Sequence, residues 1–259
     1  MSSSRFYLAL RCLFRTFAAF YHLQPMNFLH RNGVFLTLCL MLIVALGICL
    51  LYIPKAELHL FLCDRHTPIL DTFYKYYTQI GEWVPYIVCI ALLFYKAGWA
   101  AFTLSGTLLS GLVTQILKHI ANAPRPLTYF ATNYPDIQLP LVEGVTMSRF
   151  YSFPSGHTTT FFALFFALCI IGTNVLYKHI NRFTNLHTYK FTNCFWQAAC
   201  FFFAALGGYS RIYLSQHFAA DVLGGLCVGL LITGLLYIVF YHLQYQNWFN
   251  RHFFAKKMR

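Results

Sequence analysis

The sequence has 259 residues, of which 58% are hydrophobic and only 10% are charged. Soluble domains usually have about a quarter of their residues charged, so this composition argues against a soluble protein. The net charge of +12 suggests nucleic-acid binding at first, but the charges are distributed along the chain as membrane topology requires, which argues against that class.

Long uncharged runs indicate a membrane protein, since a transmembrane helix needs about 20 mostly apolar residues. The runs without Asp, Glu, Lys or Arg that reach this length are 32–54, 97–117, 157–177, 191–210 and 222–250. A further run, 83–95, is shorter and becomes long enough if Lys96 snorkels to the interface. We therefore predict an all-α, polytopic membrane protein, with six transmembrane helices in a bundle and short interfacial helices.

The same boundaries predict three parts: a cytoplasmic amphipathic segment (1–32), a six-span domain (33–245) and a basic cytoplasmic tail (246–259). Most Lys and Arg residues then fall in inward segments, and all 7 acidic residues fall in outward ones. This positive-inside bias places both termini in the cytoplasm. Residues 5–22 either lie in the membrane plane as a helix or only set the topology.

The first outer segment contains a helix-start signal. Thr67 and Pro68 supply an N-cap and a proline at the first turn. Apolar and aromatic residues then recur at helical spacing as far as Ile80, and Gly81 can end the helix. We expect a short helix that lies on the membrane surface.

The third span ends in a basic segment with Lys118 and Arg125, where Pro124 and Pro126 stop the helix. A long outer loop, 122–154, follows; such loops are usually functional or disordered. His119 lies beside Lys118, and we interpret it as an interfacial residue at the helix end.

The loop leads into Pro154, Ser155, Gly156 and His157, directly before the fourth span. The unpaired backbone N–H groups at a helix N-terminus, together with the helix dipole, favour a bound anion. This segment is therefore a candidate anion-binding turn.

Between the fifth and sixth spans, the segment 210–221 contains Arg211, His217 and Asp221. Ionisable groups at the mouth of a span are costly unless they are paired. His217 and Asp221 are four residues apart, so on a helix they would share one face, and the carboxylate would orient the imidazole. In the sixth span, Gly225 and Gly229 form a G-x-x-x-G face for close helix packing.

In the six-span topology, these three segments meet at the outer surface. They bring together three cations, a helix N-terminus and two histidines, which suits a phosphoryl group whose transition-state charge lies on three oxygens. No group of acidic residues has metal-ligand spacing, so we expect the cations to take the place of a metal, with no cofactor.

The same residues resemble the type-2 phosphatidic acid phosphatase family, integral membrane lipid phosphatases related to vanadium haloperoxidases. The pattern of that family is K-x6-R-P, then P-S-G-H, then S-R-x5-H-x3-D. The chain matches it with Lys118 to Pro126, Pro154 to His157, and Ser210 to Asp221, without departure at any motif position.

The resemblance implies the role of each motif residue. His217 would be the nucleophile that forms a phosphohistidine, oriented by Asp221, and His157 would protonate the leaving oxygen and later activate water. The resemblance assigns phosphate binding to a further set: Lys118, Arg125, Ser155, Gly156 and Arg211.

These roles imply a metal-independent hydrolase that removes phosphate or pyrophosphate from a membrane lipid at the outer face of the cytoplasmic membrane, with no obligate protein partner and no nucleic acid. The family suggests an envelope lipid, either lipid A or undecaprenyl pyrophosphate. Phosphatidate and phosphatidylglycerol phosphate are alternative substrates. A vanadate-dependent haloperoxidase and a phosphate-binding transporter are alternative functions, which bromide oxidation and solute flux would test.

Overall fold

The computed structural model describes residues 25–183 and 186–243, and these residues form helices joined by loops. The N-terminal segment before Pro25 and the tail after Leu243, including the predicted amphipathic helix at 5–22, lie outside the described residues. The described helices are α2 (Pro25–Arg31), α3 (Gly33–Tyr52), α4 (Lys55–Cys63), α5 (Pro68–Tyr77), α6 (Ile80–Tyr95), α7 (Ala97–Ala121), α8 (Pro126–Asn133), α9 (Gly156–Phe183), α10 (Leu186–Tyr213) and α11 (Ala219–Leu243).

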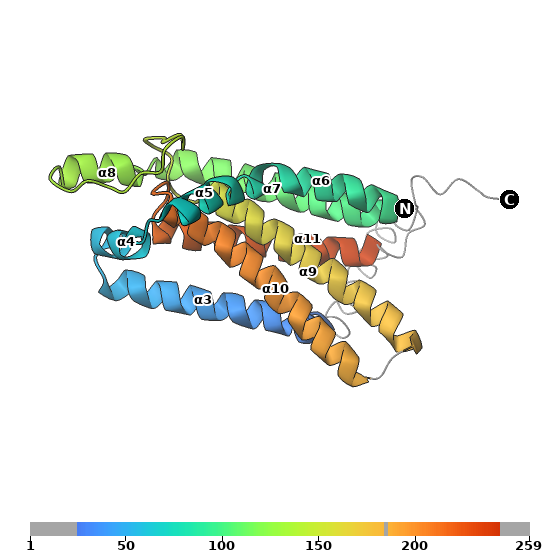
Figure 1. The fold of residues 1–259 in the computed structure, drawn as a ribbon. Coiled ribbons are helices and arrows are strands. Elements are labelled where there is room, and N and C mark those ends of the chain that lie inside the picture. The colour runs from blue at the N-terminus through green and yellow to red at the C-terminus, as the bar shows by residue number, and fades with distance from the viewer. Residues whose placement is uncertain (1–24, 184–185, 244–259) are drawn as a thin grey trace, which may run out of the picture.

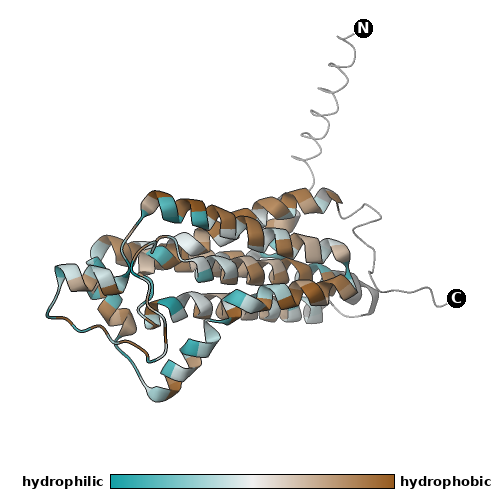
Figure 2. Cartoon of the chain, turned by 90° about the horizontal axis from the view of Figure 1, so that it is seen from above, coloured by the Kyte–Doolittle hydropathy of each residue, from teal (hydrophilic) through white to brown (hydrophobic). Residues whose placement is uncertain are grey.

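The long helices run side by side as a bundle, and the short helices α4 and α8 lie at one end of it, on the left in Figure 1. We call this end the site end. Hydrophobic residues dominate the long helices, whereas hydrophilic ones gather at the site end (Figure 2). Helix α9 packs against α10, α11, α7 and α6.

Four helical segments of the described chain are long and apolar enough to cross a membrane: Gly33–Tyr52, Ala97–Asn133, Gly156–Tyr177 and Ala219–Tyr241. The pair α5 and α6, bent by 44°, makes a fifth if it is one span. Helix α10 has 28 residues but is too polar on average to be counted with them. The all-α membrane fold is therefore confirmed, and the number of six spans stays a prediction.

The outer segment before α6 differs from the prediction in two ways. Thr67 does cap α5, since its hydroxyl accepts a hydrogen bond from Leu70 N at 3.3 Å, but α5 ends at Tyr77 rather than at Gly81. The chain bends there, and Gly81 lies in the first turn of α6. A second short helix, α4, precedes α5 and was not predicted, because its residues 55–63 mix apolar and charged types without a clear signal.

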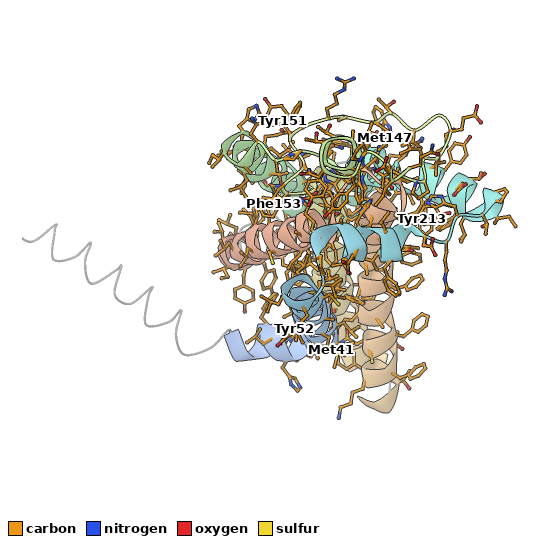
Figure 3. All side chains as sticks on the ribbon, turned by 90° about the vertical axis from the view of Figure 1, so that its left-hand side faces the viewer. Met41, Tyr52, Met147, Tyr151, Phe153 and Tyr213 are labelled. Carbon is orange, nitrogen blue, oxygen red and sulfur yellow. The ribbon has the colours of Figure 1, made fainter. Side chains whose placement is uncertain are left out.

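The loop 122–154 contains a helix that its proline-rich sequence did not indicate. Helix α7 ends where Asn122 adopts a left-handed conformation with a φ of 39°, just before the two prolines. Helix α8 then forms inside the loop, and its Phe130 is buried against Ala56 and Phe218. This packing holds the rest of the loop over the site end, where Figure 3 labels Met147 and Tyr151.

The predicted glycine face of α11 is confirmed by its contact with α9. A Cβ added at Gly225 would lie 2.6 Å from the Ser155 carbonyl oxygen, and one at Gly229 would lie 2.7 Å from the Thr159 carbonyl oxygen. Both distances are shorter than van der Waals contact allows, and a backbone atom cannot rotate away. The two glycines therefore let α11 approach the first turns of α9, where the anion-binding turn begins.

We expect Gly229→Ala to destabilise the protein by about 1–3 kcal/mol, the usual cost of overpacking. Gly234→Ala on the same helix is the matched control, because its Cβ would meet only Phe166 at an ordinary 3.8 Å. That change should be neutral or stabilising, since alanine favours helix by about 1 kcal/mol over glycine. Thermal unfolding of the purified protein in detergent measures both, and an unchanged or higher midpoint for Gly229→Ala would contradict the close packing.

Candidate active site

A cavity of about 820 Å³ opens between the site-end segments. Six of the eight predicted site residues line it: Lys118, Arg125, Gly156, His157, Arg211 and His217. The remaining two, Ser155 and Asp221, are buried: Asp221 Oδ2 lies 3.3 Å from His217 Nδ1, and Ser155 N donates to the Asp221 carbonyl. The three motifs that topology was expected to bring together do converge.

Asp221 is held by hydrogen bonds from two neighbours and in turn orients His217. Its Oδ2 atom accepts hydrogen bonds from Phe218 N at 2.9 Å and from Ser152 Oγ at 2.5 Å, and lies 3.3 Å from His217 Nδ1. Because α11 begins at Ala219, His217 precedes the helix, and the expectation that both residues share a helix face is wrong. Instead the carboxylate reaches back over the first turn, as the acidic residue of a capping box does.

The environment of His217 keeps its imidazole neutral. Its side chain is 1% exposed, and burial lowers its pKa to about 3, with Arg211 and Arg125 acting in the same direction and the Asp221 hydrogen bond opposing them. Nδ1 faces the carboxylate, which leaves Nε2 for the cavity that the residue lines. A neutral imidazole with Nε2 toward the cavity has a lone pair available for attack.

Arg211 is a buried cation with an unused donor. The residue is 4% exposed, and one terminal nitrogen donates to Thr78 Oγ1 at 2.5 Å. Its Nε atom is buried and has no hydrogen-bond partner among the described residues. A buried guanidinium donor without an acceptor is costly, and an anionic oxygen in the cavity would satisfy it.

Lys118 and Arg125 approach the same turn from α7 and the loop after it. The ammonium of Lys118 lies near Gly156, since a Cβ added there would be 3.9 Å from Lys118 Nζ. Arg125 Nε donates to Phe150 O at 3.1 Å, which holds its guanidinium at the cavity wall. Together with Arg211, they place three cations around the N-terminus of α9.

Ser155 caps α9. Its Oγ atom accepts hydrogen bonds from Thr158 N at 3.4 Å and from Thr158 Oγ1 at 2.9 Å, while its own backbone N–H donates to the Asp221 carbonyl at 2.9 Å. These bonds join the second motif to the third. Since Ser155 is fully buried, its assignment as a phosphate ligand stays a prediction.

Three residues outside the predicted set complete the site. Glu82 Oε1 lies 2.8 Å from His157 Nε2, Thr78 binds Arg211, and Ser152 binds Asp221. Glu82 carried one available signal, an acid at the outer end of a predicted span. A threonine and a serine in outer segments carry none, because such residues are common in any loop.

The arrangement can hold a tetrahedral anion against His217. Three cations and the first N–H groups of α9 face one cavity, and a neutral imidazole oriented by a buried carboxylate lines its wall. His157, which belongs to the motif at the start of α9, can supply or accept a proton. These parts suit the transfer of a phosphoryl group to histidine and then to water.

The chain is similar to a known protein family and to an individual protein along much of its length. The model of the PAP2 superfamily matches residues 99–245. The chain is 29% identical over 198 residues to the lipid A 4′-phosphatase of Porphyromonas gingivalis, covering 73% of this chain and 75% of that protein.

Two crystal structures share the fold. LpxE of Aquifex aeolicus is similar with a TM-score of 0.50 at 24% identity, over 70% of this chain and 93% of that one. The first transmembrane PAP2 type phosphatidylglycerolphosphate phosphatase from Bacillus subtilis is similar with a TM-score of 0.54 at 22% identity, over 84% of this chain and 98% of that one.

Proposed function

Because the chain belongs to the PAP2 superfamily and is a membrane-embedded phosphoric ester hydrolase, we propose that it removes a phosphate group from lipid A. The observation that carries the proposal is the buried Arg211, at the wall of a cavity that His217 also lines, whose Nε donor has no acceptor in the part of the chain that the structure describes. A phosphate oxygen bound to Arg211 would be surrounded by the groups that stabilise the transition state of phosphoryl transfer.

The size and lining of the cavity support a sugar head group. A volume of about 820 Å³ is in the range of sites that enclose a whole small molecule, which is far more than one phosphate needs. Uncharged polar side chains also line the cavity: Gln79, Gln115, Thr146, Ser148 and Gln216. Hydroxyl and amide groups of a phosphorylated glucosamine would find partners there, and the similarity to a lipid A 4′-phosphatase favours this substrate over undecaprenyl pyrophosphate.

In the proposed mechanism, His217 Nε2 attacks phosphorus, and the bond from phosphorus to the sugar oxygen breaks. His157 gives its proton to that oxygen. Water then attacks the phosphohistidine while His157 takes a proton from it, which releases phosphate and restores both histidines. Asp221 remains ionised and stabilises the positive charge on the His217 ring, and the cations neutralise the phosphoryl oxygens.

We propose that the site end faces the outside of the cytoplasmic membrane, with both termini in the cytoplasm. The positive-inside bias of the sequence supports this orientation. The lipid would bind with its tails in the bilayer and its phosphate at the level of the first turn of α9. Labelling of a single cysteine placed at the site end, with a reagent that does not cross the membrane, tests the orientation.

The proposed substrate is tested by phosphate release from purified lipids in detergent with EDTA. We expect kcat/KM for lipid A to exceed that for undecaprenyl pyrophosphate, phosphatidate and phosphatidylglycerol phosphate by at least about tenfold, the discrimination that about 1.4 kcal/mol provides. EDTA should leave the rate unchanged. No release from lipid A, with release from another lipid of the panel, would contradict the substrate but not the phosphatase activity.

We expect Arg211→Lys to lower kcat about 10²–10³-fold, as loss of one donor to the transition-state charge does. A lysine keeps the charge but cannot bind Thr78 and a phosphate oxygen at once through a planar fork. Arg65→Lys, an exposed position before α5, is the matched control and should change kcat less than twofold. Equal activity of the two variants would show that Arg211 does not contact the phosphate.

A further inference from the structure

Glu82 pairs with His157 from outside the three motifs. Its Oε1 lies 2.8 Å from His157 Nε2, and the two side chains are 49% and 23% exposed. Glu82 belongs to α6, which precedes the residues that the family model matches. The family pattern therefore assigns it no role.

The approach of α6 to α9 brings the pair together. Gly81, next to Glu82, lies so close to α9 that an added Cβ would be 2.9 Å from a ring atom of Phe161 and 3.6 Å from His157 Cδ2. The Cδ2–Nε2 edge of the imidazole therefore faces α6. The opposite edge, with Nδ1, is the one left for a substrate in the cavity that His157 lines.

The charges around His157 are otherwise unfavourable to its acid form. The cations Arg211, Lys118 and Arg125 all interact with it electrostatically from the other elements of the site. Among the described acidic residues, Glu82 is the one that lines the same cavity. A carboxylate in hydrogen-bond contact with an imidazole favours its protonated form and fixes its orientation.

We propose that Glu82 is a positioning residue for His157, whose carboxylate accepts the Nε2 proton and so presents a protonated ring to the oxygen of the leaving group. When the bond from phosphorus to that oxygen breaks, the Nδ1 proton moves to the oxygen, and Glu82 keeps its charge throughout. His157 then takes a proton from the water that attacks the phosphohistidine. This role rests on the proposed function and adds a second carboxylate–imidazole contact, beside that of Asp221 and His217, to the chemistry of the site.

The test compares two phosphate esters that differ in their need for an acid. One is hexadecyl phosphate, whose alkoxide leaves poorly without a proton, and the other is a 4-hexadecyl-2-nitrophenyl phosphate, whose nitrophenolate leaves unaided. We expect Glu82→Gln to lower kcat/KM about 10–100-fold for the alkyl ester, a part of what general acid catalysis contributes. For the nitrophenyl ester the loss should be less than about threefold, because bond cleavage there needs no proton.

Two further variants make the test specific. Glu57→Gln, the same change at an exposed position in the first turn of α4, should leave both rates unchanged. In a His157→Gln background, adding Glu82→Gln should cost less than about twofold on the alkyl ester, since the partner is already absent.

Three results would overturn the role of Glu82: equal losses on both esters, a full additional loss in the His157→Gln background, or a gain in activity. A gain would mean that the carboxylate competes with phosphate for the cations. Failure of the proposed function has a different signature, which is retention of both activities by His217→Ala.

Discussion

His217→Ala should lose at least about 10⁴-fold in kcat, because the residue that forms the covalent intermediate has no substitute in the site. In the structure its Nδ1 faces Asp221, which leaves Nε2 toward the cavity. Phosphate release from lipid A in detergent measures the effect. Rapid quenching of the wild type with radiolabelled lipid should in addition trap a phosphoenzyme that is stable to alkali and labile to acid, as a phosphohistidine is.

His119→Ala is the matched control for that experiment. His119 is exposed at the end of α7, where its Nδ1 bonds the Gln115 carbonyl at 2.8 Å, and it does not line the cavity. The change should leave kcat within about twofold, as surface substitutions usually do. If His217→Ala keeps more than a tenth of the wild-type rate, or if the label is found on another residue, His217 is not the nucleophile.

Asp221→Asn should lower kcat about 10³–10⁴-fold with little change in KM, close to the effect of the same change in another carboxylate–histidine pair. The asparagine oxygen can still accept the Phe218 N–H, so the first turn of α11 keeps its shape. The negative charge that orients His217 and stabilises its positively charged phosphorylated form is lost, however. The effect therefore falls on the chemical step rather than on binding.

Asp64→Asn, at the exposed C-cap of α4, controls for the change of charge at the site end and should leave both constants unchanged. The folded state of Asp221→Asn is checked by thermal unfolding, because Asp221 also holds Ser152. A loss smaller than tenfold, or one that appears only in KM, would assign Asp221 to structure rather than to catalysis.

The convergence of the three motifs could be predicted from the sequence because it depends on topology alone. Once the uncharged runs are read as spans, Lys118, His157 and Arg211 must lie at the same membrane face, whatever the details of packing. The glycine face of α11 was predictable for a similar reason, since residues four apart lie on one side of a helix. In both cases, the positions of the residues in the sequence determine on which side of the fold they lie.

The contacts of Glu82 and Ser152 could not be predicted because they depend on how separate segments pack. Glu82 meets His157 across 75 positions of sequence, through a 44° bend between α5 and α6 and the close approach at Gly81. Ser152 reaches Asp221 because Ser155 is tied to the start of α11. Helix α8 within the 122–154 loop was missed for the same reason, because it is stabilised by burial of Phe130 against distant residues.

A structure of the protein with orthovanadate bound would test the central claim most directly. We expect vanadium at bonding distance from His217 Nε2, with its oxygens in contact with Lys118, Arg125 and Arg211 and with the N-terminus of α9. Vanadate bound elsewhere in the molecule, or in the cavity with His217 turned away from it, would contradict the account.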